Sequence, residues 1–185
     1  GVQTCALPIF NKKYFPTKGL DCHIGYTIYT NCHSSANYSA FDTQIKKIFP
    51  ISYSTYCIPS IYGRLLFNTN TPLIYSNMIG GEGYSLDFEQ QIPFSGLIHT
   101  ENVNNVFGGM QIKFQHKIHK KQHLTLAGNY AISEHHFSNF FHGKPICGIS
   151  VGYGYESPLG PIEGFLSYSN KTKDLGFYLN IGFGF

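Results

Sequence analysis

Apolar side chains occupy every second position between Leu175 and Phe185, and glycine, tyrosine or asparagine fills the positions between them. Side chains that alternate with period two lie on opposite faces of a β-strand. The same alternation recurs at residues 20–31, 104–117, 122–134 and 146–156. These runs last about ten residues, the length of a tilted strand that crosses a bilayer, whereas strands of soluble sandwiches usually have about five or six. The pattern therefore predicts an antiparallel transmembrane β-barrel.

The composition agrees with this prediction. Charged residues make up only 12% of the sequence, about half of the roughly 25% that is usual in soluble domains. Hydrophobic residues reach 42%, yet no stretch approaches the roughly 20 continuous apolar residues of a membrane helix. A transmembrane barrel reconciles these facts, because lipid-facing apolar residues alternate with polar or small ones that face the lumen. The net charge is +3 and the basic residues are scattered, so nothing indicates a nucleic-acid partner.

The alternation predicts eight strands, which lie at residues 20–31, 39–48, 56–67, 104–117, 122–134, 146–156, 162–169 and 175–185. The pattern is weakest at 39–48, because Lys47 shares the phase of the apolar residues Phe41 and Ile45. Pro59 interrupts the third segment and is expected at an edge or a bulge, since proline cannot donate to a β-ladder.

The connections between these strands alternate in length. Residues 49–55, 118–121 and 157–161 are short, whereas 32–38, 68–103 and 134–145 are longer, although 170–174 is again short. Outer-membrane barrels have short periplasmic turns and longer outer loops, so the C-terminus is predicted on the periplasmic side. The segment 68–103 is long for a loop, and long loops are often functional.

Several motifs resemble the bacterial surface-antigen barrel superfamily, which includes the outer-membrane barrel-assembly factor and barrels fused to patatin-like phospholipases. Residues 153–162 are similar to its penultimate hairpin, and residues 15–19 are similar to a motif that opens a mid-barrel strand. The last strand resembles the C-terminal signal read by the barrel-assembly machinery. The outward residues of that signal are Phe177, Leu179, Ile181, Phe183 and Phe185. Three further stretches resemble the patatin-linked branch, namely 77–81, 89–96, and 121–124 together with Asn129 and Tyr130.

The resemblance covers residues 10–185 and implies a fold and a function. Family members have about 16 strands, so about eight strands would form half a barrel or an open curved sheet. It implies that the loop 68–103 folds back into the lumen. Assembly factors usually carry a Val-Arg-Gly-Phe-like motif in that loop, and this sequence lacks it, which favours the patatin-linked branch. The parent would then be a lipid acyl hydrolase of the bacterial outer membrane, with its catalytic domain outside this chain.

We expect one polar cluster between the long loop and the barrel wall. Arg64, the only arginine in the chain, lies in the inward phase of its strand. A charge at that position is either hydrated in the lumen or paired with a carboxylate. Glu82, Gln90 and Gln91 of the loop are the other predicted members, and Asp87 and Glu89 are alternative partners of the guanidinium group.

No catalytic, cofactor-binding or metal-binding residue is predicted in this chain. Ser150 lies in a Gly-x-Ser-x-Gly sequence, but that motif marks a nucleophile only at a sharp turn between a strand and a helix. Here it lies inside an alternating strand, so a coincidence is favoured over an esterase site. His116, His119 and His123 fit a basic periplasmic turn better than a zinc site, which needs three or four convergent ligands.

Residues 1–9 resemble a common sequencing adapter translated in frame, so we interpret them as an artefact and expect the native start upstream. The leading functional hypothesis is the membrane-anchoring or translocation barrel of a patatin-like hydrolase. It is expected to contact outer-membrane lipids, the assembly machinery and its own N-terminal domain, and it is compatible with a homo-oligomer. An assembly or translocation factor is the first alternative. A soluble β-barrel binding protein, which would fold without detergent, is the second.

Overall fold

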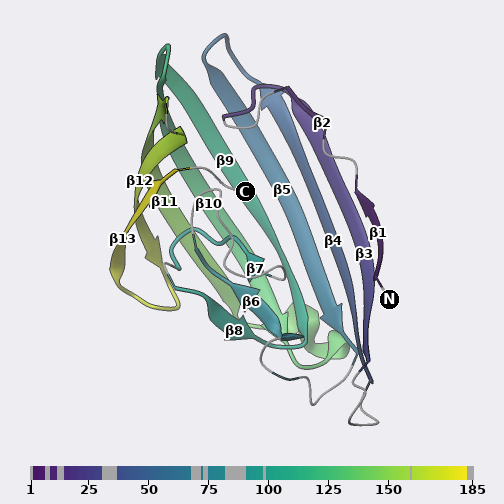
Figure 1. The fold of residues 1–185 in the computed structure, drawn as a ribbon. Coiled ribbons are helices and arrows are strands. Elements are labelled where there is room, and N and C mark those ends of the chain that lie inside the picture. Colours follow the sequence, from purple (N-terminus) through teal and green to yellow (C-terminus); the bar gives the residue numbers. More distant parts are fainter. Residues whose placement is uncertain are drawn as a thin grey trace.

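The structure is a computed structural model that describes residues 2–6, 9–11, 15–30, 37–67, 72, 75–81, 91–97, 99–158 and 160–182. Its main body is one curved antiparallel sheet (Figure 1). The strands are β1 (Val2–Ala6), β2 (Ile9–Phe10), β3 (Gly19–Thr30), β4 (Asn37–Pro50), β5 (Thr55–Leu66), β9 (Val106–His119), β10 (Gln122–Glu134), β11 (Pro145–Ser157), β12 (Gly160–Ser169) and β13 (Leu175–Ile181).

The strand order is β1-β3-β4-β5-β9-β10-β11-β12-β13, with β2 also paired to β3. All eight strands expected from the sequence are present, so the all-β, open curved sheet is confirmed. Among the described residues β1 and β13 form opposite edges and do not pair with each other. β1 pairs antiparallel with residues 23–27 of β3. The interpretation of residues 1–9 as an artefact stays a prediction.

The exposure of apolar and polar side chains on the two faces of the sheet is the reverse of that in a soluble sheet. On the convex face of β11, Ile149, Val151 and Tyr153 are exposed, whereas Ser150 and Gly152 on the other face are buried. Outward apolar residues are also exposed along β9, β10, β12 and β13, although the inward positions of β13 are only half-buried. A water-soluble sheet buries its apolar face and exposes its polar one. Apolar side chains that point outward around a polar interior are typical of a barrel wall in lipid.

Two of the predicted strands, residues 39–48 and 56–67, have irregular sequence patterns, and the structure gives a reason for each. Lys47 does lie on the outward face of β4 with Ile45, near the end of the strand, and its Nζ lies 4.7 Å from the centroid of the Phe49 ring. A lysine there can extend its ammonium group toward water. The β4–β5 register lacks a described pair at Pro59, as expected for a residue without a backbone N–H group.

Most short turns lie at one end of the sheet and the longer connections at the other, although the short β12–β13 turn lies at the end with the longer connections (Figure 1). The short-turn end holds residues 51–54, 120–121 and the turn before Gly160, where φ is +115°. Glycine is favoured there because other residues rarely adopt positive φ. The long-loop end holds the 3₁₀-helix η2 (Phe137–His142) and the β12–β13 turn. Within the described residues, no helix has the length and apolar character that a membrane-crossing helix requires.

Candidate functional site

Parts of the long connection between β5 and β9 fold over the concave face of the sheet (Figure 1). Three short strands form there: β6 (Asn77–Ile79), β7 (Gln91–Ile92) and β8 (Glu101–Val103). They pair in the order β7-β6-β8, with β6 parallel to β7 and antiparallel to β8. We call the described residues 75–81, 91–97 and 99–105 the plug. A small separate sheet satisfies backbone hydrogen bonds that a bare loop would leave open in the interior.

An apolar cluster fastens the plug to the wall. Ile79, Phe94 and Leu97 of the plug are fully buried and pack with residues of three different wall strands, which are Tyr62, Phe107 and Ala131. Full burial of one such aliphatic or aromatic side chain contributes about 1.5–3 kcal/mol. This cluster is the main hydrophobic core among the described residues, because the outer face of the sheet offers no partner layer.

The plug also approaches the wall backbone very closely. A Cβ atom added at Gly148 of β11 would lie 1.8 Å from the carbonyl oxygen of Ser95. Gly96, with φ of +97°, also lies close to β12, since a Cβ there would be 2.4 Å from the carbonyl oxygen of Tyr168. Two glycines on facing surfaces therefore allow backbone to lie on backbone. Neither contact was foreseen, because nothing local in the alternating sequence of β11 singles out Gly148.

Arg64 connects the wall to the start of the plug. The residue is only 5% exposed. Its Nη1 donates to the Asn77 side-chain oxygen at 3.1 Å and lies 3.4 Å and 3.5 Å from the carbonyl oxygens of Ser76 and Tyr75. Planar guanidinium groups suit such multiple contacts, because their donors are held in a fixed fork. The sequence had suggested carboxylate partners, and Glu82, Asp87 and Glu89 all lie outside the described residues.

Of the other predicted members of the polar cluster, only Gln91 lies within the described residues. Gln91 is buried in β7, where its Nε2 donates to the carbonyl oxygen of Gly80 at 2.7 Å. Glu82 and Gln90 lie outside the described residues. The residue that sequence reasoning missed is Asn77. It accepts from Arg64 and donates through Nδ2 to the carbonyl oxygens of Asn104 and Asn105, at 2.8 Å and 3.1 Å.

Replacing Arg64 with alanine is expected to loosen the plug. Hydrogen bonds to a charged group contribute about 1.5–3 kcal/mol each, and the carbonyl groups around Asn77 would lose that donor. Chymotrypsin should then cut the plug about ten-fold faster or more in the protein reconstituted in vesicles. Arg64→Lys keeps the positive charge but not the planar guanidinium group. Its plug should therefore be cut at a rate between those of the unsubstituted protein and Arg64→Ala. Unchanged cleavage in Arg64→Ala would show that the arginine does not hold the plug.

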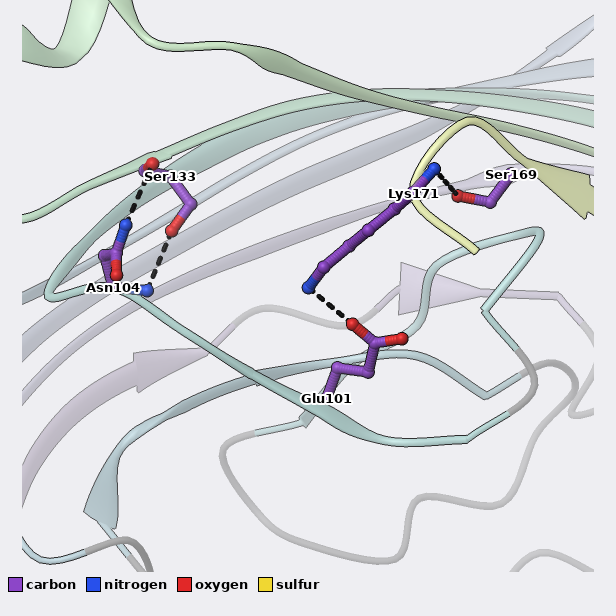
Figure 2. A network of polar contacts seen from close by, with 5 residues as sticks. All are labelled: Glu101, Asn104, Ser133, Ser169 and Lys171. Carbon is purple, nitrogen blue, oxygen red and sulfur yellow. Dashed lines mark hydrogen bonds and ion pairs between the residues drawn. The ribbon is translucent and has the colours of Figure 1, made fainter. Parts of the chain in front are cut away.

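A second set of contacts ties the plug to the long-loop end (Figure 2). Glu101 of β8 forms an ion pair of 2.5 Å with Lys171 in the β12–β13 turn. Asn104 bonds Ser133 of β10 twice, from its backbone N–H to the hydroxyl oxygen at 2.8 Å and from Nδ2 to the carbonyl oxygen at 3.2 Å. Half-exposed ion pairs contribute at most about 1 kcal/mol. The Asn104 contacts therefore fix this end more firmly than the charges do.

At the short-turn end the segment before β3 reaches across the concave face. Phe15 is 2% exposed and stacks on His123 of β10, with 4.1 Å between ring centroids. The same His123 ring bonds Glu156 of β11 through Nε2 at 3.0 Å. A Cβ added at Gly154 would clash with the Phe15 ring at 2.6 Å. This contact joins segments far apart in the sequence, so the local motif at residues 15–19 could not reveal it.

The other candidate residues from the sequence analysis that the structure describes lie within or beside strands of the sheet. Ser150 lies in the middle of β11, which continues to Ser157 without the sharp turn that a nucleophile requires. Phe177, Leu179 and Ile181 are exposed on the outward face of β13, whereas Phe183 and Phe185 lie outside the described residues. The described residues contain no group of three or more potential metal ligands.

The arrangement is a polar wall, an inward plug and an apolar outer surface. Apolar side chains on the outside and polar side chains on the inside suit a wall that lies in a membrane. Comparison with protein families agrees with this architecture. The model described as the OMP85 superfamily matches residues 3–185. A search of curated proteins finds no significant match to the chain.

Proposed function

The chain belongs to the OMP85 superfamily, a family of outer-membrane β-barrels, and from that premise we propose that it is the membrane-anchoring and translocation barrel of a patatin-like lipid acyl hydrolase. In this proposal the described sheet is part of a barrel of about 16 strands in the bacterial outer membrane. The catalytic domain is another part of the same polypeptide.

The observation that carries the membrane role is the outward apolar surface. Leu126, Val151 and Leu166 lie next to one another on β10, β11 and β12, and each is at least half exposed. Exposed apolar area of this extent on a soluble protein would favour aggregation. In a bilayer the same side chains contact lipid tails, while the strand ladders pair most backbone groups of the sheet with a neighbouring strand. Outer-membrane lipids are therefore the first partner of the chain.

The plug supports a translocation role. It is held by the Arg64 contacts, the Asn104 contacts and the apolar cluster around Phe94, each of which is local and can be broken separately. A plug held in this way can block the lumen at rest and move when a polypeptide occupies it. The exposed outward row of β13, which includes Phe177, Leu179 and Ile181, is the surface that the assembly machinery would read on a chain still being inserted.

The plug sequence favours the patatin-linked branch over an assembly factor. At the two places where the plug turns, the chain has Ile79-Gly80-Gly81 and Phe94-Ser95-Gly96 instead of a Val-Arg-Gly-Phe-like sequence. The arginine that contacts the plug is Arg64, which belongs to the wall and not to the plug sequence. An assembly factor of the same superfamily remains the second candidate, and it would carry repeated periplasmic docking domains instead of a hydrolase domain.

A fluorophosphonate probe, which labels activated serines, distinguishes these candidates in the full-length protein isolated from its native membrane. The proposal predicts labelling of one serine outside residues 10–185, located by mass spectrometry, together with phospholipid hydrolysis. The Ser150→Ala variant is the matched control and should be labelled as strongly as the unsubstituted protein. Labelling that disappears in Ser150→Ala would move the active site into this chain. A protein that is not labelled, and whose upstream sequence encodes docking repeats, would be an assembly factor.

A further inference from the structure

The 3₁₀-helix η2 lies on the outward face of the sheet instead of over the lumen. A Cβ added at Gly108 would point outward, in the same phase as Met110 and Ile112, and it would lie 2.8 Å from Cζ of Phe140. Just after the helix, a Cβ at Gly143 would lie 2.7 Å from Cγ2 of Ile132, another outward residue. The connection between β10 and β11 therefore folds over the rim and rests on the lipid-facing surface at the long-loop end.

Three phenylalanine rings form a cluster on this helix. The centroids of Phe137 and Phe140 are 6.3 Å apart with nearly parallel planes, and Phe140 meets Phe141 edge to face at 5.5 Å. Phe140 covers Gly108, but its two neighbours point away from the protein, with Phe137 64% exposed and Phe141 79% exposed. Two large apolar rings kept in water at the end of an already apolar surface would be unfavourable.

The residues around the cluster complement a phospholipid headgroup. His135 and His136 precede the helix, His142 ends it and Lys144 follows it, and all four are exposed. Glu134 is the only acidic residue in the segment 134–145. Basic side chains beside exposed aromatic rings are typical of segments that lie in a membrane surface, with the rings among the acyl chains and the bases near the phosphates.

We propose that η2 is an interfacial anchor, which inserts Phe137 and Phe141 into the lipid leaflet at the long-loop end and so fixes the depth of the barrel. The occupant is lipid, because the cluster continues the outward row of β9 without a break and packs on it through Phe140. This inference rests on the proposed membrane-spanning role. It adds a defined contact to the general lipid face, placed in a connection where the strand pattern gives no indication of one.

Tryptophan fluorescence can test the anchor, because the chain contains no tryptophan. Phe141→Trp is introduced into the complete protein reconstituted in phosphatidylcholine vesicles, and its added emission is measured against the unsubstituted protein. Lipids brominated near the glycerol backbone or near the end of the acyl chain serve as shallow and deep quenchers. The anchor predicts blue-shifted emission that the shallow quencher reduces at least two-fold more than the deep one.

The variant Phe114→Trp provides the control, because Phe114 lies on the outward face within β9. It should be quenched by the deep lipid whether or not the anchor exists. Quenching of Phe114→Trp with no quenching of Phe141→Trp would overturn the anchor and leave the membrane-spanning role intact. If neither tryptophan is quenched, the sheet is not embedded in lipid and the proposed function itself fails.

Discussion

Replacing Leu126 with arginine is expected to lower the free energy of unfolding in lipid vesicles by roughly 2–4 kcal/mol. Leu126 lies on the outward face near the middle of β10 and is 52% exposed. In a soluble protein an exposed site of this kind tolerates a charge within about ±0.5 kcal/mol. In a bilayer the guanidinium group must be taken out of water or thin the membrane around it. Urea titration of the protein refolded into vesicles measures the difference.

The matched control for this prediction is Phe49→Arg. Phe49 is also an exposed outward residue, but it lies beside Pro50 at the short-turn end of β4. An arginine near the interface costs only about 0–1 kcal/mol, because its side chain reaches water. A large cost at Leu126 with a small one at Phe49 is the depth dependence of a membrane wall. Equal and negligible costs at both sites, together with folding in the absence of detergent, would favour the soluble binding protein.

The Gly148→Ala variant is expected to displace the plug. The new methyl group would overlap the Ser95 carbonyl oxygen at 1.8 Å, and because this neighbour is backbone, one of the two chain segments must shift. Overpacking of this kind costs about 1–3 kcal/mol. Because every 1.4 kcal/mol corresponds to a factor of about ten, chymotrypsin cleavage within the plug should accelerate by roughly ten-fold, while the β-sheet circular dichroism stays unchanged.

Gly128→Ala is the corresponding control, because a Cβ at Gly128 of β10 meets nothing within 4 Å. Alanine should be neutral or slightly stabilising there, since glycine loses more backbone entropy on folding. If chymotrypsin cuts the plug at the same rate in both variants, the result would contradict the close contact between the Ser95 carbonyl group and β11. A loss of the whole sheet signal in Gly148→Ala alone would mean instead that the plug is needed for folding of the wall.

Local periodicity explains how much of this fold could be predicted. Period-two alternation indicates both the strands and the face of each side chain, and it is the basis on which Arg64 was assigned to the inward phase of its strand. The free thiols of Cys22, Cys57 and Cys147 lie in the outward phase of their strands, where cysteine acts as a small hydrophobic residue. Ends of strands were less accurate, and β4 runs through Pro50, two residues past the predicted boundary, because its last pairs with β5 outweigh the weak pattern around Lys47.

The contacts within the interior could not be predicted, because they join residues without a shared local pattern. Asn77 is one polar residue among many in the long connection, and only the folded plug places it against Arg64. Phe15 and His123 are separated by most of the chain, and a histidine in an inward phase has no feature that identifies its aromatic partner. The position of η2 on the outer face was missed for the same reason, since its link to Gly108 depends on how the connection folds.

The plug has a mechanical consequence for the wall that supports it. It is fastened to β5 through Arg64 and to the β12–β13 turn through Lys171, and β9, β10 and β11 lie between these two points. A twisted sheet can bend more tightly or flatten, and either change alters the distance between those attachments. A plug of fixed width therefore acts as a cross-brace that sets the radius of the wall. Releasing one attachment would therefore soften the curvature of the sheet around it.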